Sequence, residues 1–195
     1  MIIAFFALTT LCAQCGPSVD PSLTRAIIQV ESGGNPFAIG DNTDKRSYFP
    51  VSKSEAVELS RYLLSRGHNI DMGLMQINSC HLGSKGLSLD VLFDPCGNVN
   101  FGTRLLADYF RMHSGDPDNS QVFFKALSAY NTGSAWRGPE YINRILEAVN
   151  APYRVAVANP PQERKSRRSK VSNGSHSSRS DDYYTSPLFF PGGNL

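Results

Sequence analysis

The sequence has 195 residues, of which 41% are hydrophobic, and this length and composition allow one globular domain with appended segments. The net charge of +2 arises at the C-terminal end, because residues 159–195 hold six Lys or Arg against three Asp or Glu. Thirteen basic and fourteen acidic residues remain in residues 1–158, a charge of −1. A near-neutral domain lacks the continuous basic face that neutralises phosphates, so we expect no specific nucleic-acid partner.

Residues 1–13 begin with an apolar run that is too short to span a bilayer but suits the core of a signal peptide. We therefore expect an exported, periplasmic protein without a stable membrane span. The run departs from a standard signal peptide, because no Lys or Arg precedes it and Leu11 stands where a small residue is preferred. A buried N-terminal helix is the alternative interpretation, and a lipoprotein attached through Cys15 is a third.

The first predicted helix has clear sequence signals at both ends. Asp20 is the expected N-cap, Pro21 occupies the first helical position, and Gly33 follows the last turn. Apolar residues recur between these ends at helical spacing. The second helix begins at the capping box of residues 52–55 and stops at Gly67.

Three further helices are predicted downstream. A long, hydrophobic helix begins at residues 94–95, and two more cover about 120–130 and 139–149. Residues 35–53 are expected to form a loop or short strand, and residues 70–79 a loop that enters a helical turn near a site. Few alternating strand patterns occur, so the fold is predicted as mainly α, with a small β element between helices.

The C-terminal segment, residues 156–195, is basic and rich in Ser and Pro, with almost no aliphatic residues until Leu188. Such a composition buries too little apolar surface to offset the loss of chain entropy, so we expect disorder. Residues 187–190 form an apolar patch that suits contact with another protein. A solvated tail without a partner is the alternative.

Four cysteines suit an oxidising compartment and allow three complete pairings, which the sequence does not rank. They are Cys12, Cys15, Cys80 and Cys96. We expect a bridge between Cys80 and Cys96. The Cys12-x-x-Cys15 pair lies at the apolar leader without a second pair, and the histidines are scattered, so neither a metal site nor a cofactor is predicted.

Glu31 is the strongest candidate for a catalytic residue. It occupies the last turn of the first predicted helix, near the negative end of the helix dipole, and Ile27, Ile28 and Val30 offer an apolar surround. Both effects disfavour the ionised carboxylate and predict a raised pKa, as a general acid that protonates a departing oxygen requires. An exposed helix-end carboxylate is the alternative.

Two further motifs follow Glu31 in the chain. The set comprises residues 30–36 with Glu31-Ser32-Gly33-Gly34, residues 71–78 with Gly73-Leu74-Met75-Gln76-Ile77-Asn78, and residues 127–133 with Ala129-Tyr130-Asn131. In this order the motifs resemble the catalytic domain of soluble lytic transglycosylases, relatives of goose-type lysozyme, over about residues 15–150. Stretches at 15–17, 35–40 and 93–96 resemble more narrowly the lytic transglycosylases of type IV secretion and conjugation systems. The resemblance implies an α+β, lysozyme-like catalytic domain over residues 14–155, built around a glycan-binding groove.

The resemblance also assigns roles to individual residues, with Glu31 as the catalytic acid. The implied substrate-binding residues are Ser32, Gly73, Leu74, Met75, Gln76, Asn78, Tyr130, Asn131 and Tyr141. Gln76 and Asn78 suit this role because amides offer donors and acceptors without charge. Structural roles stay open for several: Met75 as core filler, Asn78 as a satisfied buried amide, and Tyr141 as an apolar helix residue. Ser32 is also a common choice at a helix end.

Most glycosidases need a second carboxylate, and the nearest candidates here are Asp41, Asp44 and Asp71. The resemblance implies that none is required. The 2-acetamido group of the peptidoglycan substrate would stabilise the cationic centre, Glu31 would deprotonate the muramic acid 6-hydroxyl, and the product would be a 1,6-anhydro sugar. The implied partners are peptidoglycan strands and envelope secretion components. A lysozyme-type hydrolase and a non-enzymatic, glycan-binding assembly factor are the alternatives.

Overall fold

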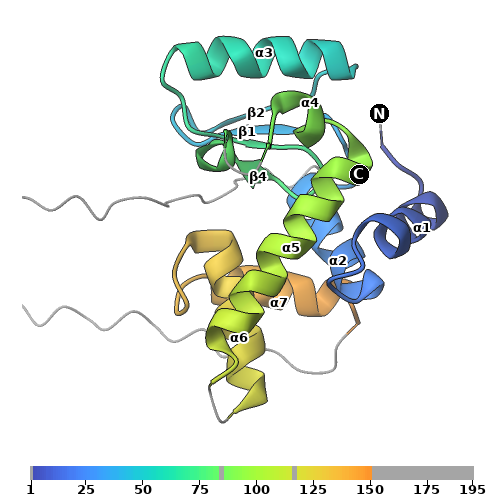
Figure 1. Ribbon diagram of the computed structural model, residues 1–195, viewed down its shortest axis with the longest axis vertical. Helices are drawn as coiled ribbons and strands as arrows, with labels where there is room; N and C mark the ends of the chain where they lie inside the picture. Colours follow the sequence, from blue (N-terminus) through green and yellow to red (C-terminus); the bar gives the residue numbers. More distant parts are fainter. Residues whose placement is uncertain (1, 84–85, 116–117, 151–195) are drawn as a thin grey trace, which may run out of the picture.

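The computed structural model of the protein describes residues 2–83, 86–115 and 118–150 (Figure 1). The elements, in chain order, are α1 (Phe5–Cys15), α2 (Pro21–Ser32), β1 (Ile39–Asp41), β2 (Arg46–Tyr48), α3 (Lys53–Ser65), β3 (Ile70–Met72), β4 (Ile77–Asn78), a 3-10 turn η1 (Ser79–His81), α4 (Leu89–Leu92), α5 (Pro95–His113), α6 (Asn119–Thr132) and α7 (Pro139–Ala148). The mainly α prediction with a small β element is confirmed. The tail predicted at 156–195, with its patch at 187–190, lies outside the described residues.

The helix ends predicted from the sequence are confirmed. The Asp20 side chain accepts hydrogen bonds from the backbone of the first turn of α2, and Gly33 ends that helix with a φ of 62°. The Ser52 side chain accepts from the backbone N–H of Glu55 at the start of α3. Asp94 caps α5 in the same way. Local side chain to backbone bonds therefore set these boundaries.

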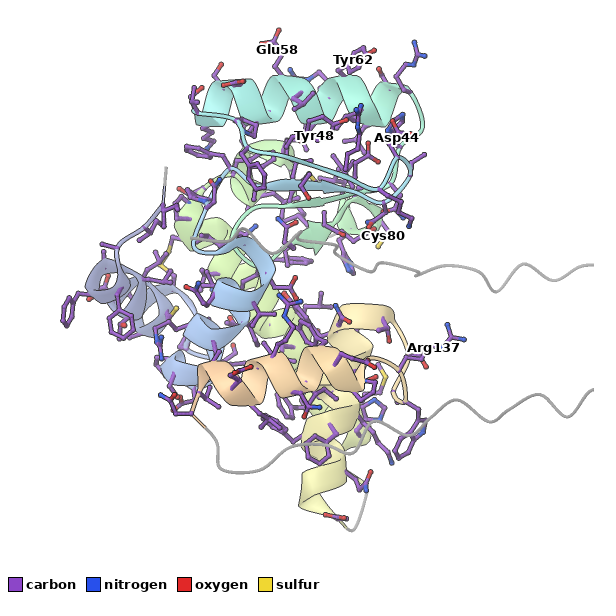
Figure 2. The ribbon with its side chains drawn as sticks, turned by 180° about the vertical axis from the view of Figure 1, so that it is seen from behind. Asp44, Tyr48, Glu58, Tyr62, Cys80 and Arg137 are labelled. Atoms are coloured by element: carbon purple, nitrogen blue, oxygen red, sulfur yellow. A yellow bond between two sulfur atoms is a disulfide. The ribbon has the colours of Figure 1, made fainter. Side chains whose placement is uncertain are left out.

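The four short strands form one antiparallel sheet in the order β2-β1-β3-β4, which α3 covers (Figure 1). Glu58 and Tyr62 of α3 point away from this sheet (Figure 2), whereas Ala56 and Leu63 are buried. The loop predicted at residues 70–79 is in fact a hairpin, β3 to β4, that leads into the expected helical turn η1. Strands β1 and β2 lie in residues 35–53, where a loop or short strand was expected, whereas β3 and β4 were missed because they are too short to show alternation.

Helix α1 packs against α2 and α5, with Leu8, Cys12 and Cys15 buried. The described fold therefore matches the alternative interpretation of an N-terminal helix that joins the core. Removal of residues 1–13 as a signal peptide stays a prediction. Within the described ranges, no helix combines the length and the apolar character needed to cross a bilayer.

The disulfide joins Cys15 to Cys96, so the predicted Cys80–Cys96 bridge is wrong. Packing of α1 on α5 brings the end of one helix beside the first turn of the other, with Cα atoms 5.2 Å apart. Cys80 instead lies in η1, exposed at the edge of the sheet region (Figure 2). The bridge spans 81 residues, and only the tertiary packing of α1 reveals it.

Candidate active site

A pocket with about 470 Å³ of empty space lies where the sheet meets the helical part of the domain. It is lined by Glu31, Asp71, Gln76, Ile77, Asn78, His81, Leu105, Tyr109, Tyr130 and Asn131. These residues come from α2, the β3–β4 hairpin, η1, α5 and α6. The three sequence motifs therefore meet at one concave site.

Glu31 is 3% exposed, so the alternative of an exposed helix-end carboxylate does not apply. Burial is the main cause that raises its pKa, to about 8. The negative charge of Asp71 raises the pKa further, while contact with the Tyr141 hydroxyl and the charge of Arg144 lower it. Glu31 is therefore protonated at neutral pH, the state that a proton donor needs.

Tyr141 lies on α7 with its hydroxyl buried beside Glu31. The contact lowers the pKa of Glu31, but its geometry falls short of a well-formed hydrogen bond. Burial, then the neighbouring Glu31, raises the pKa of Tyr141 well above its ordinary value. The phenol therefore stays neutral and keeps a proton that it can donate to the carboxyl.

Asp71 is the second carboxyl group of the pocket, and two amides hold it. The Asn42 Nδ2 donates to its Oδ2 over 2.7 Å, and the Asn78 Nδ2 donates to its Oδ1 over 2.8 Å. Both amides also donate to the Asn69 Oδ1, at 3.2 and 2.5 Å. Donors on both oxygens favour the ionised form, so Asp71 is a fixed negative charge near Glu31.

Asn78 is engaged within the protein. Besides its bonds to Asn69 and Asp71, its Oδ1 accepts from the backbone N–H of Cys80 at 3.0 Å. Although Asn78 lines the pocket, these bonds match the alternative of a satisfied buried amide. The main contribution of Asn78 to the site is the hydrogen bond that holds the Asp71 carboxylate in place.

The turn between β3 and β4 is held by Asn98 of α5. The Asn98 Oδ1 accepts from the Met75 N–H at 2.8 Å, while its Nδ2 donates to the carbonyls of Met72 and Leu92 at 3.0 and 2.9 Å. Gly73 has a φ of +77°, and a Cβ there would overlap the Asn98 amide and lie 2.5 Å from the Leu92 carbonyl oxygen. This close approach requires glycine.

Several predicted binding residues lie behind the pocket wall. Leu74 and Met75 are fully buried, and Met75 packs against Gly102 of α5, as the core-filler alternative describes. The Ser32 hydroxyl donates to the Ile28 carbonyl within α2 at 3.2 Å. With Gly73 and Tyr141, these residues do not belong to the described pocket lining. A direct contact of any of them with substrate stays a prediction.

Gln76 lines the pocket and has a buried acceptor without a partner among the described residues. Its Nε2 donates to the carbonyls of Ala38 and Gly73 at 3.1 and 2.8 Å, which orients the amide, while its Oε1 is buried without a hydrogen-bond partner among the described residues. A buried orphan acceptor costs free energy unless a ligand supplies a donor. An N–H or O–H group brought by a ligand would satisfy this acceptor.

Tyr130 and Asn131 close the pocket from the end of α6. The Tyr130 hydroxyl donates to the Met75 carbonyl at 2.8 Å, and burial is the main cause that raises the pKa of this phenol well above its ordinary value. Tyr130 thus joins α6 to the turn that carries Gln76. A buried tyrosine hydroxyl usually needs a hydrogen-bond partner, and for Tyr130 that partner is the Met75 backbone carbonyl.

Sequence reasoning missed several residues that build the site: Asn42, Asn69, Asn98 and Arg144, together with His81, Leu105 and Tyr109 of the lining. An asparagine inside an otherwise apolar helix face was a usable signal for Asn98, since such a residue needs buried partners. The others have no local signal, because their partners lie far away in the chain.

One group of side chains has the composition of a metal site. Ligand atoms of Asp41, Asp44 and His68 lie within 4.8 Å of one another at the β1–β2 turn. Protein contacts already engage Asp41: its Oδ1 accepts from the N–H groups of Thr43 and Asp44, and its Oδ2 pairs with the His68 Nδ1 at 2.8 Å. These bonds hold the β1–β2 turn in place.

The comparison with known proteins agrees with this pocket, in which a protonated carboxyl faces a polar, partly apolar cleft. The Transglycosylase SLT domain family matches residues 10–144, which include all three motifs. The chain belongs to this family and is a peptidoglycan lytic transglycosylase.

Similar proteins cover most of the chain. The type IV secretion system protein virB1 of Brucella abortus is 33% identical over 159 residues, which cover 77% of this chain and 67% of that protein. The protein virB1 of Agrobacterium fabrum is 30% identical over 165 residues, covering 84% and 67%. The invasion protein IagB of Salmonella typhimurium is 28% identical over 160 residues, covering 80% and 81%. No solved structure matches the chain.

Proposed function

We propose that the protein cleaves the β-1,4 bond between N-acetylmuramic acid and N-acetylglucosamine in peptidoglycan and leaves a 1,6-anhydro-muramic end. The observation that carries this proposal is Glu31, a buried carboxyl whose pKa is raised to about 8. Cleavage of a glycosidic bond needs an acid at the departing oxygen, and few carboxyl groups hold their proton at neutral pH.

Glu31 serves first as the acid and then as the base. It donates its proton to the glycosidic oxygen, and the bond from that oxygen to C1 breaks. The 2-acetamido oxygen of the N-acetylmuramic acid that carries C1 then bonds to C1, and the acetamido group takes up the positive charge. The Glu31 carboxylate then removes the proton of the 6-hydroxyl, whose oxygen displaces the acetamido group at C1. Glu31 ends protonated, and no water is consumed.

Asp71 and Gln76 support this sequence. Asp71 is held by Asn42 and Asn78, and its negative charge favours the positive charge that develops in the substrate. The buried Gln76 Oε1 suits the acetamido N–H, which would orient the acetamido oxygen toward C1. Asp71 thus acts as a fixed charge, and the substrate supplies the nucleophile.

The test is the chemical identity of the ends that the protein produces. Purified peptidoglycan is digested, and the muropeptides are identified by mass spectrometry and by a reducing-end assay. We expect 1,6-anhydro ends, and loss of at least a hundredfold in rate in Glu31→Gln. Reducing ends alone would establish a lysozyme-type hydrolase instead. Asp44→Asn, an exposed carboxyl outside the pocket lining, is the matched control.

We further propose that the protein is exported and opens the peptidoglycan locally for a type IV secretion or conjugation apparatus. The two virB1 relatives support this role, and one of them is named for such a system. A deletion strain that lacks its virB1 protein is complemented with the wild type or with Glu31→Gln. Equal rescue by both would favour the non-enzymatic assembly factor; rescue by the wild type alone supports cleavage.

A further inference from the structure

Arg144 of α7 reaches across to the end of α2, where Glu31 lies. Its guanidinium donates to the Val30 carbonyl over 3.0 Å, and Val30 immediately precedes Glu31. The last carbonyls of a helix lack intrahelical partners. Here the Gly33 N–H donates to the Gln29 carbonyl and the Asn35 N–H donates to the Ser32 carbonyl. The Val30 carbonyl accepts from Arg144. An arginine thus fixes the helical turn that carries the catalytic carboxyl.

Charged and titratable groups face Glu31 from each element packed around it. Asp71 faces it from β3, Tyr130 from α6, and Tyr141 and Arg144 from α7. Tyr109 of α5 and His81 of η1 line the same pocket. Arg144 is the cation of this set. Its charge lowers the pKa of Glu31, whereas the charge of Asp71 raises it.

We propose that Arg144 is a positioning residue for Glu31, which holds the last turn of α2 through the Val30 carbonyl and balances the negative charge of Asp71. Its importance for catalysis rests on the proposed function. Glu31 must first donate a proton and then accept one, and a residue with both duties works best when neither form is strongly favoured. Burial and Asp71 both favour the protonated form, so a cation is needed to keep the base step accessible.

Exposure of Arg144 makes this role testable without disturbing the core. Arg144→Gln keeps a neutral N–H donor but removes the charge, whereas Arg144→Lys keeps the charge on a different donor geometry. Arg61→Gln, an exposed arginine on α3 and outside the pocket lining, is the matched control. Circular dichroism checks that all variants fold.

The first readout does not depend on cleavage. The full chain is labelled with 13C in the glutamate carboxyl groups, Glu31→Gln identifies the Glu31 signal, and the signal is titrated by NMR. We expect Arg144→Gln to raise the titration midpoint of Glu31 by roughly half a pH unit to one pH unit. Arg144→Lys should stay within about a quarter of a unit of the wild type, as should Arg61→Gln. An unchanged midpoint in Arg144→Gln would overturn the proposal.

The second readout is the pH profile of peptidoglycan cleavage. Arg144→Gln should move the alkaline fall of activity upward by the same amount as the NMR midpoint, whereas a merely structural arginine would lower the rate equally at every pH. A changed midpoint without cleavage by the wild type would refute the proposed function alone. Cleavage by the wild type with an unchanged midpoint and profile in Arg144→Gln would refute the role of Arg144 alone.

Discussion

Glu31 and Asp71 line one pocket but have opposite hydrogen-bond environments. Asp71 receives an amide N–H on each carboxylate oxygen, whereas Glu31 is buried and, among the described residues, its hydrogen-bonding contact is with the Tyr141 hydroxyl, at imperfect geometry. The same fold therefore holds one carboxyl as an anion and the other as an acid. The two groups are coupled, because the charge of Asp71 helps to raise the pKa of Glu31.

The coupling predicts how activity depends on pH. Wild-type cleavage should fall above a pH of about 8, where Glu31 loses its proton. Asp71→Asn removes a negative charge that raises the Glu31 pKa, so the fall should move to lower pH. The measurement is the initial rate of anhydro-product release between pH 5 and pH 10. Asn42→Ala is the control, since it loosens Asp71 without removing charge; an equal displacement in this variant would contradict the coupling.

Glu31 should destabilise the folded protein. Its pKa is about 8 in the fold and about 4.3 when unfolded, so between these values folding requires Glu31 to take up a proton, and stability falls as pH rises. Glu31→Gln removes this cost and should raise the free energy of unfolding by about 2–4 kcal/mol at pH 7.5, but by about 1 kcal/mol or less at pH 5.

Urea unfolding at the two pH values measures the effect. Glu58→Gln is the control, because Glu58 is an exposed glutamate on α3 that points away from the sheet (Figure 2). It should change stability equally, and by little, at both pH values. A Glu31→Gln variant less stable than the wild type at pH 7.5 would contradict the burial of a protonated carboxyl.

Gly73 and Gly67 separate backbone strain from steric conflict. Their φ values are +77° and +79°, but a Cβ at Gly67 meets nothing within 4 Å, whereas at Gly73 it overlaps the Asn98 amide. We expect Gly67→Ala to cost about 1 kcal/mol of stability. Gly73→Ala should cost about 3 kcal/mol or more and abolish cleavage, because Asn98 must release its buried partners. Thermal unfolding and peptidoglycan digestion of the two variants test this; equal losses would show that only backbone strain matters.

The disulfide connectivity has a direct thermodynamic test. Removing the Cys15–Cys96 bridge with Cys96→Ser should lower the free energy of unfolding by about 2–4 kcal/mol, because the bridge closes a long loop in the unfolded chain. Cys80→Ser should change it by no more than about 0.5 kcal/mol. A comparable loss in both variants would instead indicate the pairing of Cys80 with Cys96. Denaturant unfolding under non-reducing conditions gives both values.

Local signals predicted the helical framework, whereas the family resemblance supplied the members of the catalytic motifs. The capping bonds of Asp20, Ser52 and Asp94 join residues within one helical turn, so the local sequence is enough to predict them. The raised pKa of Glu31 was also predicted in direction, although the helix-end argument was secondary to complete burial. Burial depends on what α7 and the hairpin bring against α2.

Residues that act across the fold escaped prediction. Asn98 forms hydrogen bonds to the hairpin turn, Arg144 donates to a carbonyl at the end of α2, and Cys96 forms a disulfide with Cys15. In each case the partners lie far apart in the sequence. Their roles depend on which elements pack together, and neither periodicity nor capping encodes that. Met75 shows the same dependence on packing: its side chain is buried in the core while its peptide groups bond to α5 and α6, and a contact of Met75 with substrate stays a prediction.

Those peptide groups have a consequence for hydrogen exchange. A turn between two short strands ordinarily exchanges its amide hydrogens quickly through local opening. The Met75 N–H is bonded to Asn98 of α5, and the Met75 carbonyl bond to Tyr130 of α6 holds the turn beside it, so we expect this buried amide to exchange only when the turn detaches from these helices. Its protection factor should therefore approach that of the helical core. On heating, the enzyme should keep a formed pocket until the whole domain unfolds, and inactivation should coincide with loss of helix.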